Sequence, residues 1–189
     1  MRSLLILLAT LVPVTTAPVG AAHVSAAYVG TSHVATRDLH ADVRDAIKHV
    51  KLTDPGLQKF FDNSVGYAVF PGITKGAIGV GAAHGDGEVI ERGTTVGTCS
   101  MTQVNIGLQL GGQQYSEIIF FETKDALEQF KAGHFTFDAQ ASAVAVASGA
   151  SANAKYRSQV AVFTQAKGGL MYEASIGGQK FGYKPIGAT

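Results

Sequence analysis

Four lysines near glycine-rich segments are the side chains in this sequence best suited to bind a ligand. Lys75 stands immediately before the run GAIGVGAAHGDG, and Lys167, Lys180 and Lys184 lie in the C-terminal third. Residues 151–189 contain five Lys or Arg residues and one Glu, a net charge of +4. Such a local excess of positive charge attracts an anionic group, such as a phosphate or a carboxylate. Lys167, Lys180 and Lys184 are therefore candidate ligand-binding residues, and Lys75, which we expect to emerge at a sheet end, is the fourth.

The other polar patterns argue against enzyme chemistry. Gly76, Gly79 and Gly81 have the spacing G-x-x-G-x-G, which is neither the dinucleotide fingerprint nor a P-loop, and no helix pattern follows. The six histidines form no H-E-x-x-H sequence and no pair four residues apart, and no G-x-S-x-G sequence occurs. We therefore expect no catalytic residues, no metal and no cofactor, and a protein that is not an enzyme.

The N-terminal residues are typical of a secretory leader. A positive start with Arg2 precedes the apolar run SLLILLATLVPV and the small-residue segment TTAPVGAAHVSAA. This order predicts a signal peptide over residues 1–22, with cleavage as late as 27, then a linker over 23–36. An exported protein, periplasmic or secreted, is expected. Cys99 has no disulfide partner in the chain, and we expect it to be a buried small apolar residue.

The net charge argues against nucleic acid as a partner. Without Arg2, the chain carries 14 Lys and Arg residues against 14 Asp and Glu residues. A nucleic-acid-binding domain would show a basic surplus. The positive charge of residues 151–189 is thus balanced elsewhere, and it favours a local site for an anionic ligand.

The elements that must position the lysines follow from periodicity and caps. Residues 37–50 place Leu39, Val43, Ile47 and Val50 on one helical stripe, and Asp54 followed by proline begins a second helix. A third helix begins after the cap Thr123 and ends at Gly133. HGDG (84–87) and GGQQ (111–114) are typical of hairpin turns. A period of two predicts strands at 65–70, 74–83, 87–98, 101–111, 114–121, 139–148, 158–165, 169–177 and 179–184.

The glycines inside these strands indicate bends or close approach of neighbouring backbones. Several such glycines in successive strands suit a small, bent sheet. The predicted fold class is therefore α+β and β-rich. It is a single domain with a strongly coiled, mostly antiparallel sheet or a barrel-like core, and a few flanking helices.

Four segments together resemble the SYLF domain family. They are VGYAVFPGITKGAIGVGAAHGDGEVI, VNIGLQLGGQQYSEIIFFETKDALEQF, GHFTFDAQASAVA and AKGGLMYEASIGGQKFGY. The resemblance runs from about residue 37 to residue 183, and it implies a β-rich domain with flanking helices over residues 37–185. The positions that fall on the family's motifs are Phe70, Pro71, Lys75, Gly76, Gly79, Gly107, Gln109, Gly111, Asp138, Gly177, Gly178, Gln179 and Lys180.

The resemblance also implies a function. Eukaryotic members are associated with phosphoinositide-rich membranes and some with actin, whereas bacterial members with signal peptides are described mainly as lipid binders of the cell envelope. The expected function is an extracytoplasmic, non-enzymatic binding domain for a lipid or an anionic amphiphile. Its expected partner is a membrane surface with anionic headgroups. The alternative is a structural or protein-interaction component of the envelope without a small ligand. One departure is the helix over residues 37–50, whose charges are balanced, which weakens a role in membrane insertion.

Overall fold

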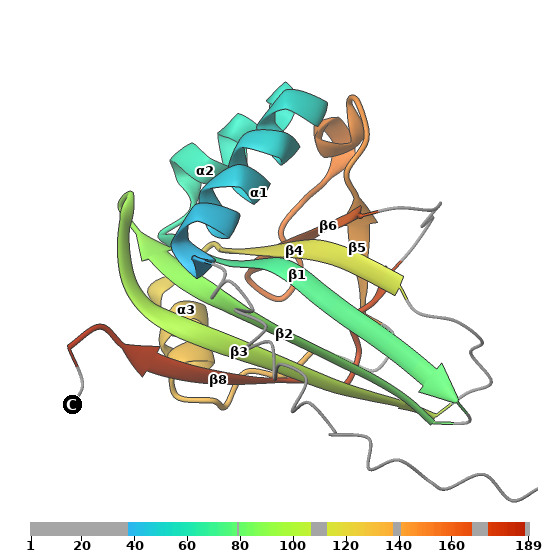
Figure 1. The fold of residues 1–189 in the computed structure, drawn as a ribbon. Coiled ribbons are helices and arrows are strands. Elements are labelled where there is room, and N and C mark those ends of the chain that lie inside the picture. Colours follow the sequence, from blue (N-terminus) through green and yellow to red (C-terminus); the bar gives the residue numbers. More distant parts are fainter. Residues whose placement is uncertain (1–37, 79, 107–112, 138–140, 168–173, 188–189) are drawn as a thin grey trace, which may run out of the picture. The chain divides into compact units, whose positions relative to one another are not determined.

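The computed structural model describes residues 38–78, 80–106, 113–137, 141–167 and 174–187, which belong to the compact unit Thr36–Thr189 (Figure 1). The predicted signal peptide and linker lie outside the described residues. The helices are α1 (Leu39–Thr53), α2 (Gln58–Asn63) and α3 (Lys124–Lys131), with 3-10 turns at Pro55–Leu57 and Ala150–Asn153. None of the described helices is long and apolar enough to cross a membrane.

Eight described strands form one sheet. They are β1 (Gly66–Ile78), β2 (Val80–Glu91), β3 (Thr94–Ile106), β4 (Gln113–Phe121), β5 (Ser142–Ala145), β6 (Val160–Ala166), β7 (Ala174–Ser175) and β8 (Gln179–Pro185). The spatial order is β7-β5-β6-β4-β1-β2-β3-β8, and every described pair is antiparallel except β5 with β6. The predicted α+β, β-rich and mostly antiparallel fold is confirmed. The sheet is open and uncurled, with β7 and β8 at its edges, rather than strongly coiled or barrel-like as expected.

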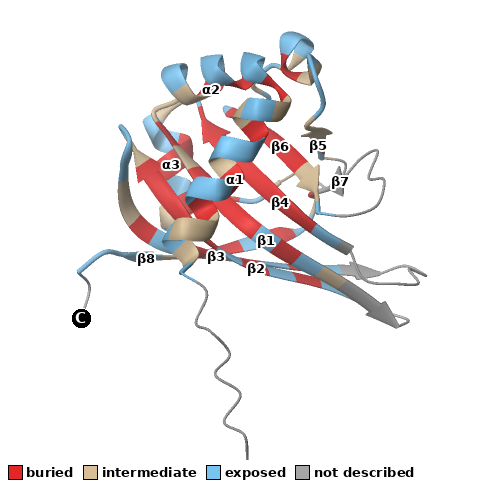
Figure 2. Ribbon diagram, turned by 45° about the horizontal axis from the view of Figure 1, so that its top comes forward, coloured by how far each residue is buried: buried red, intermediate tan, exposed pale blue. Residues whose placement is uncertain are grey.

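Helices cover both faces of the sheet (Figure 1). On the face that we call the α1 face, Val43 and Val50 of α1 and Phe60 of α2 pack against Phe120 and Phe163 of the sheet. On the opposite face, the α3 face, the buried α3 residues Ala126, Leu127 and Phe130 pack against Phe70, Met101 and Phe121. Figure 2 shows that the buried middle of β1 and β4 lies beneath α1. Two apolar layers therefore enclose the centre of the sheet.

The helix boundaries agree with the predicted caps. Asp54 follows the last residue of α1 and accepts a hydrogen bond from the Gly56 backbone N–H at 3.1 Å, so it caps the next turn. Asp54 also accepts from the backbone N–H of Ser151 at 2.7 Å, which ties this turn to the distant segment Ala150–Asn153. Thr123 caps α3 by accepting from the Ala126 N–H, and Gly133 follows with φ of 71°. The capping residues next to each helix in the sequence were therefore sufficient to predict where these helices begin and end.

Both predicted hairpin turns are wrong. HGDG lies inside β2, where Gly85 pairs with Met101 and Gly87 with Cys99. The real turn between β2 and β3 is at Arg92 and Gly93, both with positive φ, inside a predicted strand. The hairpin expected at GGQQ would pair β3 with β4, but β3 lies between β2 and β8 while β4 lies between β1 and β6.

The strand glycines allow neighbouring strands to approach closely, as predicted. A Cβ atom on Gly87 would overlap the carbonyl oxygen of Val69, and one on Gly97 would overlap the ring of Tyr183. A Cβ atom on Gly85 would lie 2.8 Å from a side-chain carbon of Ile73. Glycine is therefore required at these positions by space rather than by a turn. Gly79 and Gly107, for which the same role is expected, lie outside the described residues.

Candidate functional site

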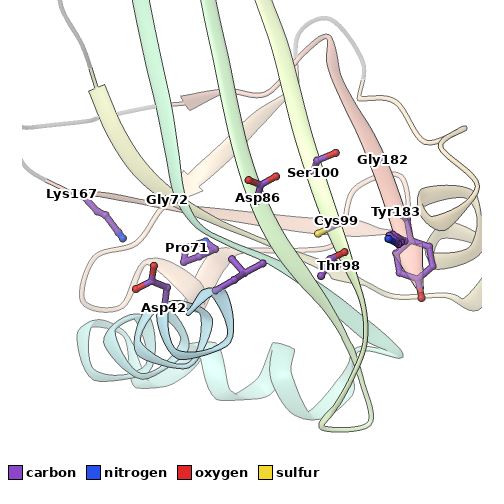
Figure 3. Close-up of a pocket in the computed structure, with 12 residues that line it drawn as sticks. Asp42, Pro71, Gly72, Asp86, Thr98, Cys99, Ser100, Lys167, Gly182 and Tyr183 are labelled. Atoms are coloured by element: carbon purple, nitrogen blue, oxygen red, sulfur yellow. The ribbon is translucent and has the colours of Figure 1, made fainter. Parts of the chain in front are cut away.

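A groove of about 650 Å³ lies where the first turn of α1 meets the sheet (Figure 3). Leu39 and Asp42 of α1 line one side, and Asp86 and Ser100 rise from the strands. Lys167, at the end of β6, and Tyr183, on β8, lie at opposite sides of the close-up. We call this cavity the lysine groove, because Lys167 and Lys184 both line it.

Strand register places Lys180 and Lys184 on the α1 face. Residues directly opposite each other on antiparallel strands share a face of the sheet. Lys184 is opposite Thr98, which is opposite Glu88, and Glu88 contacts α1 through His40. Lys180 is opposite Thr102 in the same ladder, an even number of residues along β8, so it shares that face. Both lysines are exposed.

Lys167 reaches the same face from the other side of the groove. Two residues earlier in the chain, the Gln165 side chain hydrogen-bonds His49 and Thr53 of α1, so alternate positions of this strand face α1. Lys167 lies 3.9 Å from the position that a Cβ atom would take on Gly72. Three of the four predicted lysines therefore occupy one face of the sheet, although they come from two distant strands.

Lys75 lies on the opposite face. It is opposite Ala83, and both Ala83 and Ile73 belong to the apolar core on the α3 face. The side chain is half-buried, and burial lowers the pKa of its ammonium group. The structure does not bring Lys75 together with Lys167, Lys180 and Lys184.

The other predicted motif residues have structural positions. Phe70 is fully buried in the α3-face core, and Pro71 lines the lysine groove beside Gly72. The strand register shifts between Phe70 and Ile73, so this Phe-Pro motif forms a β-bulge. Gly76 lies in β1, and Gly177 and Gly178 precede β8, with Gly178 at φ of 76°. Gly79, Gly107, Gln109, Gly111 and Asp138 lie outside the described residues.

The groove carries charges of both signs. Asp42 and Asp86 line the groove together with Lys167 and Lys184, and the Oδ1 atom of Asp86 is 3.7 Å from the Nε2 atom of His84. Lys167, Lys180 and Lys184 form no ion pair with any other residue that the structure describes. Their ammonium groups are thus available to an anion, while the aspartates limit how many anions the groove accepts.

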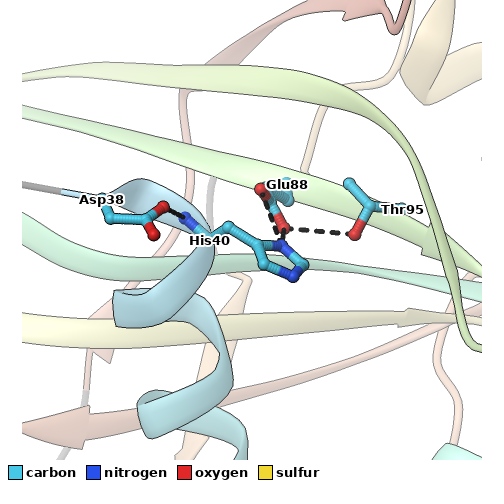
Figure 4. A network of polar contacts seen from close by, with 4 residues as sticks. All are labelled: Asp38, His40, Glu88 and Thr95. Carbon is cyan, nitrogen blue, oxygen red and sulfur yellow. Dashed lines mark hydrogen bonds and ion pairs between the residues drawn. The ribbon is translucent and has the colours of Figure 1, made fainter.

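A polar network fixes α1 above the groove (Figure 4). The Nδ1 atom of His40 lies 3.0 Å from the Oε2 atom of Glu88, and the Thr95 hydroxyl donates to the same oxygen at 3.2 Å. Asp38 caps the helix by accepting from the His40 backbone N–H at 3.1 Å. Glu88 is only 6% exposed, so the network joins the start of α1 to β2 at a buried point.

A second polar cluster lies inside the α3 face. Glu117 of β4 is completely buried, and its Oε2 atom accepts a hydrogen bond from the Gln179 amide at 3.0 Å. Burial raises the pKa of Glu117 to about 7, although the hydrogen bond from Gln179 opposes this shift. The other carboxyl oxygen has no hydrogen-bond partner among the described residues, and neither does the hydroxyl of Thr164, the residue opposite on β6.

Sequence reasoning missed Glu117, although the strand pattern contains the signal. Tyr115, Ile119 and Phe121 alternate with Glu117 on the same side of β4, and all three are buried. A carboxyl group at one of these positions has to be buried too. Cys99 is buried as predicted, and burial raises the pKa of its thiol, helped by the charges of Asp86 and Glu88. No cluster of metal-binding side chains is found in the described part of the chain.

Comparisons with known proteins agree with the resemblance seen in the sequence. The family model Ysc84, described as "Las17-binding protein actin regulator", matches residues 102–183. The chain is also similar to Beta cell expansion factor A of Aeromonas veronii, with 28% identity over 128 residues. This match covers 67% of the chain but 49% of the relative, so the chain spans about half the length of that protein. Residues 102–183 of this chain thus match the model of the SYLF (Ysc84) domain family, in agreement with the resemblance of the sequence segments.

Proposed function

We propose that this protein is an extracytoplasmic, non-enzymatic domain that binds anionic lipid. The membrane contact is the α1-face surface of β8 together with the end of β6. The observation that carries the proposal is the presence of Lys167, Lys180 and Lys184 on this one face, exposed and without ion pairs among the described residues. The lipid association of the SYLF family supports the same assignment.

The open sheet edge makes this surface accessible. β8 is the last strand of the sheet, and on the α1 face its residues Lys180, Gly182 and Lys184 are all exposed. Each cationic side chain near an anionic bilayer contributes about 1 kcal/mol, and salt screens this attraction. Two or three lysines therefore give a weak, reversible and salt-dependent association.

Vesicle flotation tests the proposal. The parent protein is expected to float with vesicles of phosphatidylglycerol and phosphatidylcholine, to bind much less to phosphatidylcholine alone, and to dissociate as salt is added. Lys180→Glu combined with Lys184→Glu is expected to weaken binding by at least about 30-fold, since about 2 kcal/mol is lost.

The matched control is Lys75→Glu combined with Lys124→Glu. It changes the net charge equally, but Lys75 is on the α3 face and Lys124 begins the helix that covers that face. We expect this control to bind like the parent. Equal loss in both double variants would show that only net charge matters. Failure of the parent to bind any anionic vesicle would favour the alternative, a protein-interaction component, which is also what the family model's description names.

A further inference from the structure

A second cavity lies at the other end of the sheet. Its volume is about 790 Å³, within the range of roughly 300–1,000 Å³ that is usual for small-molecule sites. It is next to the parallel pair β5 and β6, whereas the open edge strand β8 is at the opposite end of the sheet order. None of its described lining residues belongs to the lysine groove.

Small side chains leave this space open. Residues 141–154 have the sequence ASAVAVASGASANA, in which alanine and serine dominate, and they contribute β5 and the turn that follows it. The cavity opens to solvent where Asn153, Lys155, Arg157 and Ser158 line it, since these residues are exposed. Part of its lining is apolar and includes Phe135, Phe137, Ala143, Val162 and Ile176.

The polar side of the cavity favours an anion. Lys155 and Arg157 line it, are exposed, and form no ion pair with other described residues. Tyr156 lies between them, and its hydroxyl is buried without a hydrogen-bond partner in the described part of the chain. A phenol hydroxyl donates readily to a carboxylate or phosphate oxygen. No Asp or Glu occurs among the described lining residues, although burial and, to a lesser degree, the negative charge of Glu122 raise the pKa of Tyr156.

We propose that this cavity binds one amphiphile with a single aliphatic chain and an anionic headgroup. The chain lies against Phe135, Val162 and Ile176, and the headgroup is held by Lys155, Arg157 and the hydroxyl of Tyr156. The inference rests on the proposed lipid-binding function, but it uses different residues, so the two proposals can fail separately.

Titration with the fluorescent probe dansyl-undecanoate tests the site in the full chain. The parent is expected to bind one probe per chain saturably, and dodecanoate should displace it, whereas dodecanol should displace it less well. Lys155→Gln and Arg157→Gln should each weaken carboxylate binding by roughly fivefold. Tyr156→Phe keeps the ring and should weaken carboxylate binding without affecting dodecanol.

Two filling variants test the chain-binding part. Ala154→Phe adds a ring at a half-exposed lining position, and Ala143→Leu enlarges a buried one. Variants that melt cooperatively, as seen by circular dichroism, should lose saturable probe binding but float with anionic vesicles like the parent. Lys180→Glu combined with Lys184→Glu should keep saturable probe binding but lose flotation with anionic vesicles.

Three results would overturn the inference. The first is that the folded parent does not bind the probe. The second is that both folded filling variants bind the probe like the parent. The third is that replacing Lys155 and Arg157 leaves the affinity for the carboxylate unchanged. If the filling variants lose vesicle binding as well, the aliphatic chain comes from a bilayer lipid, and a free amphiphile as the source is refuted.

Discussion

Replacing Glu117 by glutamine should remove much of the pH dependence of this protein's stability. The Glu117 carboxyl is completely buried, and burial raises its pKa from 4.5 to about 7. Between these two values the folded chain holds a proton that the unfolded chain has lost. Raising the pH through this interval therefore favours unfolding. Glutamine has nearly the same shape as the protonated acid, and its carbonyl oxygen can still accept from the Gln179 amide.

The size of the effect follows from the shift in pKa. A rise from 4.5 to about 7, at about 1.36 kcal/mol per unit, corresponds to about 3 kcal/mol of stability. This contribution is present in full below pH 4.5 and is lost as the pH rises through about 7. The difference in unfolding free energy between the Glu117→Gln variant and the parent should thus shift in favour of the variant by about 3 kcal/mol between pH 4 and pH 8.

Urea unfolding followed by circular dichroism is the appropriate assay, because the chain contains no tryptophan. Both proteins are unfolded at several values between pH 4 and pH 8, with Glu122→Gln as a control at an exposed position next to the same strand. The control shows how much of any change comes from removing one exposed carboxyl group beside β4. The reasoning is refuted if the Glu117→Gln difference is constant to within about 0.5 kcal/mol.

Two further variants test packing. Gly87→Val should destabilise the fold by roughly 1–3 kcal/mol in urea unfolding, because its side chain would overlap the Val69 carbonyl. Gly72→Ala is the control and should change stability little, because the nearest atom to its new Cβ is the Lys167 ammonium nitrogen at 3.9 Å. Equal losses of stability in both variants would argue against a close approach of the β1 and β2 backbones at Gly87. The thiol of Cys99 is buried with a raised pKa, so it should react with iodoacetamide only in denaturant; rapid labelling of the native protein would show that this part of the sheet is accessible.

The helices could be predicted because their signals are local. Asp54 and Thr123 cap the residues next to them in the chain, and Val43 and Val50 repeat at the helical period. The fold class followed from the change to a period of two after residue 65. The ends of the strands were harder to predict, because a glycine in a turn and a glycine at a close contact between strands look alike in a sequence. Gly85 and Gly87 are needed for close contact between strands and not for a turn.

The candidate site was predicted in part. Lys167, Lys180 and Lys184 share a face, which the sequence left open, but Lys75 does not. The reason is the bulge at Phe70–Ile73, where Pro71 and Gly72 both line the groove. Without this extra residue, strand alternation would place Lys75 on the same face as the other three lysines. A bulge reverses which face the following side chains occupy. Its position depends on pairing with the neighbouring strand, so it cannot be predicted from the sequence of one strand alone.

The position of β8 also has a consequence for the order of folding. β8 pairs with β3, and the hydrogen bond from the Gln103 side chain to the Gly177 carbonyl oxygen joins residues 74 positions apart. During synthesis, β1 to β4 leave the ribosome well before β8, so the edge of β3 has no partner strand in the interval. Lys180 and Lys184 are held in place only when β8 pairs. A nascent chain therefore acquires the surface that we propose binds lipid last, after most of its core can form.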